Sequence, residues 1–124
     1  GLYRDAAEQF GMLDAQAWRA ARLVVDTGIH ALRWSRQRGI DQLLDAGLSE
    51  TDAVIETDRY IAHPGQALAY KIGQREIERL RRELARRDGS AFDLRAFHDA
   101  VLGHGSLPLA TLAAELPRWL RPTA

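Results

Sequence analysis

The chain has 124 residues, of which 46% are hydrophobic and 27% charged, a composition typical of one folded domain rather than of a disordered segment. Its 17 basic residues balance its 17 acidic residues, so we expect neither a nucleic-acid partner nor a membrane partner. No apolar run approaches the ~18 residues that cross a bilayer. Because the chain has no cysteine, disulfide and thiolate chemistry are excluded and the compartment stays open.

Helical periodicity runs through the whole sequence, and no segment alternates as a strand does, so we predict an all-α fold, an irregular bundle of about five to six helices. Residues 1–14 are predicted as a short helical turn or loop, with Asp14 capping a long helix that ends near Leu32. Gly28 lies inside this helix, where glycine costs ~1 kcal/mol against alanine. We therefore expect another group to pack close to its backbone.

The next two helices are marked by their capping residues. Ser35 is predicted to begin a second helix, which Gly47 ends. Ser49 and Asp52 resemble a capping box at the start of a third helix, with Asp in place of the usual Glu or Gln. Residues 63–65 (His-Pro-Gly) are predicted to end that helix, because the residue before proline is forced out of helical geometry.

The second half of the chain is also helical. A fourth helix is predicted over about residues 66–87, and Asp93 and Pro108 mark the starts of two more, the last ending around Trp119. Two pairs of opposite charge at spacing four are expected to form solvated ion pairs: Glu78 with Arg82 and Glu83 with Arg87. The buried stripe of the fourth helix is predicted to consist of Ala69, Gly73, Ile77, Leu80 and Leu84.

A polar stripe interrupts the otherwise apolar first long helix, and it is either the wet face of an ordinary helix or the wall of a polar cavity. Asp26 and His30 lie one turn apart, so the carboxylate is positioned to orient the imidazole for acid–base or oxyanion chemistry; the alternative is an exposed, inert pair. Arg22 either clamps a substrate carboxylate or pairs with Asp26. The members of the stripe are Arg19, Arg22, Asp26, His30 and Arg33.

A second group of candidates follows the His-Pro-Gly break. Gln66, Tyr70 and Gln74 repeat at spacing four along one helix face. Tyr70 could donate to an oxyanion and Lys71 could anchor a negatively charged substrate; the alternative is a tyrosine at the core margin. A metal site is not predicted, because there is no HExxH motif and no two of the four histidines stand at spacing three or four.

Three long segments carry a resemblance to a known family: RLVVDTGIHALRW (22–34), DRYIAHPGQALAYKIG (58–73) and FDLRAFHDAVLGHGSLPL (92–109). They closely resemble the bacterial family called domain of unknown function 885, over nearly the whole chain. The resemblance implies a larger helical metallopeptidase-like fold, related in architecture to angiotensin-converting enzyme and thimet oligopeptidase. Its HExxxGHH-like zinc helix and its EGWALY-like segment lie upstream of the region matched here.

By this resemblance, residues 1–124 are a single helical domain or fragment, the C-terminal region of a longer zinc-dependent peptidase. The chain would hold no metal and would be inactive alone, with zinc expected in the full-length protein and a peptide-like substrate. The resemblance assigns oxyanion-stabilising roles to His30, oriented by Asp26, and to Tyr70. It assigns substrate contacts to Arg22, Gln66 and Lys71.

Two other interpretations stay open. The first is a non-catalytic helical interaction or scaffold module, and the second is an acid–base enzyme that uses Asp26 and His30 without a metal, although no nucleophile supports it. A fragment would also expose apolar surface where its missing part docked, which predicts a homodimer through that surface. Because the family is bacterial, the compartment is either the cytoplasm or the exterior of the cell.

Overall fold

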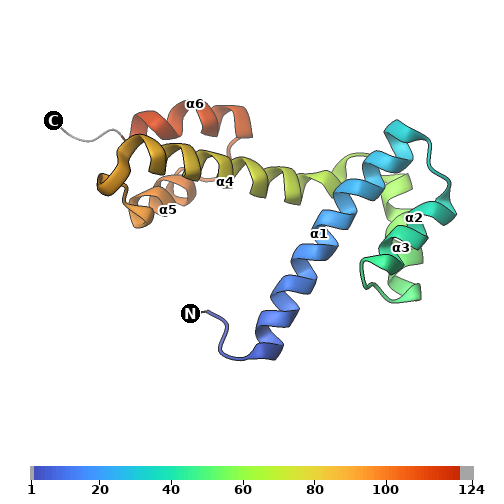
Figure 1. Ribbon diagram of the computed structural model, residues 1–124. Coiled ribbons are helices and arrows are strands. Elements are labelled where there is room, and N and C mark those ends of the chain that lie inside the picture. Colours follow the sequence, from blue (N-terminus) through green and yellow to red (C-terminus); the bar gives the residue numbers. More distant parts are fainter. Residues whose placement is uncertain (1, 121–124) are drawn as a thin grey trace. The chain divides into compact units, whose positions relative to one another are not determined.

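The predicted all-α fold is confirmed by a computed structural model, which describes residues 2–120 and contains no strand among them (Figure 1). Residue 1 and residues 121–124 of the predicted 1–124 domain lie outside the described residues. The elements are α1 (Ala6–Leu32), α2 (Arg36–Asp45), α3 (Glu50–Ala62), η1 (Gln66–Leu68), α4 (Ala69–Asp88), η2 (Gly89–Ala91), α5 (Leu94–Gly103) and α6 (Leu109–Trp119).

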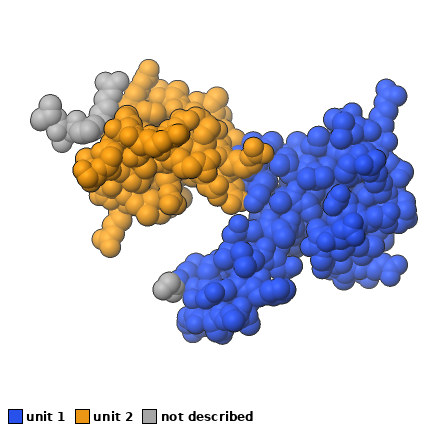
Figure 2. Space-filling model, in the orientation of Figure 1, with its two compact units in different colours: residues 1–72 blue, residues 73–124 orange. Residues whose placement is uncertain are grey.

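The chain forms two compact units, coloured separately in Figure 2. Unit 1 comprises residues 1–72, with α1, α2, α3, η1 and the first residues of α4. Unit 2 comprises residues 73–124, with the rest of α4, η2, α5 and α6. The residues to which the sequence analysis assigns catalytic or substrate-binding roles all belong to unit 1: Arg22, Asp26, His30, Gln66, Tyr70 and Lys71.

The first long helix starts earlier than predicted. Its N-cap is Asp5, whose Oδ1 accepts a hydrogen bond from the Glu8 amide at 2.8 Å, so the expectation of a loop up to Asp14 is wrong. The intervening residues are mostly good helix formers, and nothing in them stops the helix once Asp5 satisfies its first turn. The other end is as predicted: α1 ends at Leu32, and Arg33 has a left-handed backbone (φ 57°).

The predicted caps at Ser35 and Ser49 and the close approach at Gly28 are confirmed. Ser35 Oγ accepts from the Arg38 amide at 3.2 Å, and Ser49 Oγ accepts from the Asp52 amide at 3.1 Å. A Cβ built on Gly28 would overlap the Trp34 ring. Glycine at this position therefore lets the indole fold back onto the helix that precedes it.

The core of unit 1 lies where α1, α2, α3 and η1 meet, and it consists of small and branched side chains around one buried tyrosine. Val25, Leu43 and Tyr60 have no exposed surface. Together with four further residues they form one cluster: Ala21, Val25, Ile40, Leu43, Ala53, Tyr60 and Ala67. This packing brings the second half of α1 against the end of α3 and the turn that follows it.

Unit 2 has a separate apolar core, formed by Leu80, Leu84, Phe97, Leu112 and Leu116. The predicted stripe of α4 is therefore only half right. Leu80 and Leu84 are buried and Ile77 is half-buried, but Ala69 is exposed and Gly73 is only half-buried. The reason is that the core residues of α5 and α6 pack on the C-terminal half of α4, which leaves its first turns outside the cluster (Figure 1).

The surface charges of α4 pair differently from the prediction. Glu78 lies 3.8 Å from Arg82 as expected, but Glu83 pairs with Arg79 at 2.6 Å. Arg87 instead pairs with Asp88 and donates to two carbonyls at the end of α6. No described helix is both long and apolar enough to cross a membrane.

Candidate functional site

The polar stripe of α1 divides into buried and exposed parts. Arg22 is 8% exposed and Asp26 only 2%, whereas Arg19, His30 and Arg33 are exposed. The middle of the stripe is buried because residues 60–70 pack against it. The polar stripe is therefore not simply the solvent-exposed face of a helix.

Asp26 binds the backbone of the His-Pro-Gly turn. Its Oδ1 and Oδ2 accept from the Gly65 amide at 3.1 and 3.0 Å. Gly65 has a left-handed backbone (φ 81°), which glycine adopts without strain. Among the described residues no hydrogen bond joins Asp26 to His30, so the predicted orientation of the imidazole by Asp26 is wrong. The carboxylate is held instead by a backbone donor 39 residues away in the sequence.

The Tyr60 carbonyl orients His30. The Nε2–H of His30 donates to this oxygen at 3.0 Å. The helical partner of the Tyr60 carbonyl would be the amide of Pro64, which has no hydrogen to donate, so the proline leaves an acceptor available at the end of α3. With Nε2 engaged, the neutral ring carries its free lone pair on Nδ1, and on protonation Nδ1 becomes a donor. The ring itself is exposed.

Arg22 has an unusual environment for a nearly buried cation. Its guanidinium carbon lies 4.5 Å from the centroid of the Tyr70 ring and 5.7 Å from that of Tyr60. Its Nε is buried and makes no hydrogen bond. Within residues 2–120 it forms no ion pair, so the predicted alternative of an Arg22–Asp26 pair is wrong, because Asp26 is held by Gly65.

A charged network beside Arg22 was not singled out from the sequence. Tyr60 donates its hydroxyl to Glu56 Oε2 at 2.7 Å, and Arg59 holds the same carboxylate through Nε at 3.1 Å and Nη2 at 2.5 Å. Arg59 Nη1 also donates to Gln66 Oε1 at 2.7 Å, which ties one predicted residue to the network. The signal was present, because Glu56, Arg59 and Tyr60 stand three and four apart on one helix face.

The network shifts the acidity of its members. Burial by itself would raise the pKa of the Glu56 carboxyl, but hydrogen bonds from Arg59 and Tyr60 and the positive charges of Arg59 and Arg22 outweigh burial and lower that pKa. Burial and the hydrogen bond to Glu56 raise the pKa of the Tyr60 hydroxyl above its usual range. Glu56 is therefore held as a carboxylate and Tyr60 as a neutral phenol.

The remaining predicted residues lie at the surface of the same unit. Tyr70 is 50% exposed and touches Arg22 through its ring. Gln66 is exposed, and Lys71 is half-buried in the first turn of α4. The fold thus brings Arg22, Tyr70 and, through Arg59, Gln66 to the side of α1 where residues 60–70 pack.

The residues present do not fit a zinc ion. Across residues 2–120, no group of three or more His, Asp or Glu side chains is arranged to hold a metal. Asp26 and His30 are each engaged by backbone groups of the chain itself.

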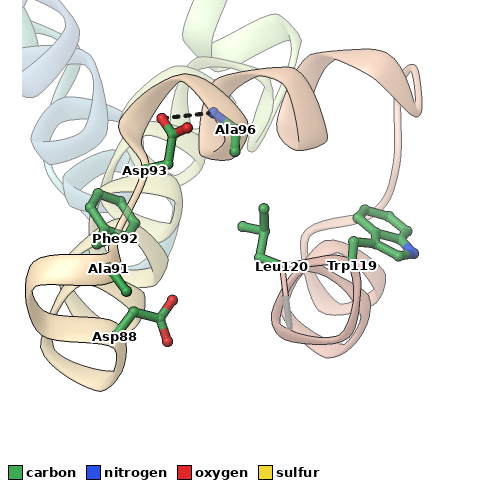
Figure 3. A pocket seen from close by; sticks show the side chains of 7 residues that line it. All are labelled: Asp88, Ala91, Phe92, Asp93, Ala96, Trp119 and Leu120. Atoms are coloured by element: carbon green, nitrogen blue, oxygen red, sulfur yellow. Dashed lines mark hydrogen bonds between the residues drawn. The ribbon is translucent and has the colours of Figure 1, made fainter. Parts of the chain in front are cut away.

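Unit 2 contains a cavity of about 250 Å³ that includes none of the predicted residues (Figure 3). Its two carboxylates already have partners: Asp88 pairs with Arg87, and Asp93 accepts from the Arg95 and Ala96 amides as the cap of α5. The other walls are Ala91, Phe92, Ala96, Trp119 and Leu120. This cavity is mostly apolar, and its acids are used by the fold.

The chain belongs to the family described as "Bacterial protein of unknown function (DUF885)", which it matches over residues 1–116. It is similar to a solved structure described as "the putative lipoprotein from Colwellia psychrerythraea", with 46% identity and a TM-score of 0.88. The likeness covers 91% of this chain and 20% of that one, so the chain spans about a fifth of the length of that relative. No curated protein matches the chain.

Proposed function

We propose that this chain forms one wall of the substrate cleft of a longer zinc-dependent hydrolase that acts on peptide-like substrates. The resemblance of residues 22–34 and 58–73 to the peptidase-like family supports this function. The length of the relative, of which the chain matches a fifth, supports its being one portion of a larger helical fold. Zinc bound by the remainder of that fold would supply the activated water.

The single observation that carries the proposal is the state of His30, an exposed imidazole that is nevertheless held in one orientation. The Tyr60 carbonyl engages Nε2, which leaves Nδ1 for a substrate. A protonated Nδ1 would donate to the oxygen of a tetrahedral intermediate as negative charge develops there. The half-exposed Tyr70 hydroxyl is the second candidate donor. Arg22, Gln66 and Lys71 are assigned substrate contacts.

Exposed apolar side chains on α1 support docking against further protein. Phe10 is 71% exposed and Leu13 58%, and Leu2 just before the helix is 86% exposed. In the larger fold we expect other helices to cover this face; in isolation it would favour a homodimer. The same face would serve a non-catalytic scaffold, which is the alternative function. The relative's description as a lipoprotein favours an exported protein over a cytoplasmic one.

The test is hydrolysis of unstructured peptides by the full-length protein, with residues numbered as in this chain. We expect His30→Ala to lower kcat about 10²–10³-fold, the effect of removing one oxyanion donor, and Tyr70→Phe to lower it similarly. Arg19→Ala is the matched control, because Arg19 is an exposed member of the same stripe whose side chain donates only to the Ala15 carbonyl.

Two outcomes would contradict the proposal. If His30→Ala and Arg19→Ala have equal activity, the imidazole has no role in turnover. If the full-length protein, loaded with zinc, cleaves no peptide while circular dichroism shows it folded, the scaffold function is favoured instead.

A further inference from the structure

Arg22 is the one side chain of the described residues in which a nearly buried guanidinium has neither a hydrogen bond nor an ion pair. It is 8% exposed, and its Nε is buried without an acceptor. Nη1 and Nη2 are not among the buried atoms without a partner, so they remain reachable from solvent, whereas the buried Nε loses its water without gaining an acceptor. The two tyrosine rings offset only part of that loss, since a cation–π contact contributes ~0.5–2 kcal/mol.

The acidic side chains near Arg22 accept hydrogen bonds from other groups. Both oxygens of Asp26 face the Gly65 amide. Glu56 is close enough for the charge of Arg22 to lower its pKa, but its oxygens are taken by Arg59 and by the Tyr60 hydroxyl. Neither carboxylate forms an ion pair with Arg22 within the described residues, so the guanidinium is left open to an anion from outside the chain.

We propose that Arg22 binds a carboxylate of the ligand, namely the free C-terminal carboxylate of a peptide, resting on the proposed function for the ligand being a peptide. A guanidinium presents several donors in one plane, which matches the two oxygens of a carboxylate. Access lies on the side of Tyr70, because Tyr70 is 50% exposed whereas Tyr60 is fully buried.

The surrounding charges favour a monoanion over a phosphate dianion. Asp26 and Glu56 are both near Arg22, and the pKa of Glu56 is lowered, so it keeps its negative charge at neutral pH. Because Arg59 is already paired with Glu56, Arg22 offers one unpaired positive charge, which one carboxylate neutralises and a dianion exceeds. The site is thus suited to one negative charge.

The experiment is an NMR titration of the 124-residue chain that follows the Arg22 Nε–H signal. The probes are N-acetyl-Ala-Ala with a free carboxylate, the same peptide as its C-terminal amide, and inorganic phosphate. Arg22→Gln removes the charge and keeps a polar side chain, and Arg22→Lys keeps the charge without the planar donors. Arg19→Gln is the matched control, and circular dichroism verifies that each variant is folded.

We expect the free-acid peptide to shift the Arg22 signal with saturation in the millimolar range, and the amide and phosphate to bind at least tenfold more weakly. Arg22→Gln should weaken binding of the free-acid peptide at least tenfold, and Arg22→Lys should weaken it less. Arg19→Gln should leave this binding unchanged. Equal binding of acid and amide, tighter binding of phosphate, or unchanged binding by Arg22→Gln would overturn the inference.

The inference and the proposed function fail separately. If the full-length protein cleaves peptides but treats free and amidated C-termini alike, the carboxylate site is wrong and the hydrolase stands. If the free acid binds at Arg22 but no peptide is cleaved, the carboxylate site stands and the hydrolase is wrong.

Discussion

Units 1 and 2 are both helical, but they bury different kinds of side chain. The nearly buried polar and charged side chains of the described residues are Arg22, Asp26 and Thr57, and all three belong to unit 1. The buried core of unit 2 is entirely apolar. Its ion pairs join residues no more than four apart on the surface of single helices or at their ends.

The difference indicates where function is concentrated. A fold that needs only stability buries apolar groups, as unit 2 does, because unpaired polar groups cost free energy in the interior. Unit 1 keeps a guanidinium without a partner and holds an exposed imidazole through a backbone carbonyl. Such exceptions to good packing are expected at sites that act on a ligand.

The largest change in stability is expected when one aspartate in each unit is replaced by alanine and the two losses are compared. Asp26→Ala removes a charged acceptor from the interior of unit 1, and we expect the free energy of unfolding to fall by ~1.5–3 kcal/mol. Asp93→Ala removes an exposed helix cap from unit 2, for which ~1 kcal/mol is expected. Urea denaturation measures both, and equal losses would show that the Asp26–Gly65 contact contributes no more than a cap.

Replacing one arginine in each unit by methionine should change the free energy of unfolding in opposite directions. Arg22→Met replaces an unpaired cation by an apolar side chain that fits between two rings, and we expect the free energy of unfolding to rise by ~0.5–2 kcal/mol while carboxylate binding is lost. Arg87→Met removes a residue that bonds Asp88 and two carbonyls, so stability should fall by ~1 kcal/mol. If thermal melts show that Arg22→Met is less stable than the parent chain, Arg22 has a stabilising partner within the fold.

The smallest expected effect is on the loss of stability at acidic pH. The pKa values of Glu56 in unit 1 and Glu76 in unit 2 are both lowered in the folded state, Glu76 chiefly by its hydrogen bond from Arg79. A lowered pKa contributes stability above the unfolded value, near 4.5, and that contribution disappears as the pH falls below it. Glu56→Gln should therefore flatten the loss of stability below pH 4.5.

Glu76→Gln is the matched control, because the Glu76 and Arg79 side chains are 24% and 43% exposed, against 16% and 31% for Glu56 and Arg59, so solvent screens the Glu76 pair more. In 0.5 M KCl the difference between Glu76→Gln and the parent chain should shrink more than the difference between Glu56→Gln and the parent chain. Denaturation curves between pH 3 and 7 at two salt concentrations give the comparison. Identical salt dependence of the two variants would contradict the partial burial of the Glu56 network.

Most of the secondary structure could be predicted because its signals are local. Ser35 and Ser49 cap helices, Gly28 admits a neighbouring ring, and the His-Pro-Gly turn ends α3, each through residues within a few positions of one another. The start of α1 was misplaced because Asp5 and Asp14 are both acceptable caps, and only the helix formed in the structure decides between them.

The candidate residues were also found in the sequence, but their partners were not. Spacing places Asp26 beside His30 and Arg22 beside Asp26, and it says nothing of residues 30 to 40 positions away. Only the tertiary structure decides that Asp26 binds Gly65, that His30 binds Tyr60, and that Arg22 is left without an anion. The physical reason is that backbone groups left unpaired by Pro64 and its turn lie within reach only after α1 and α3 have packed together.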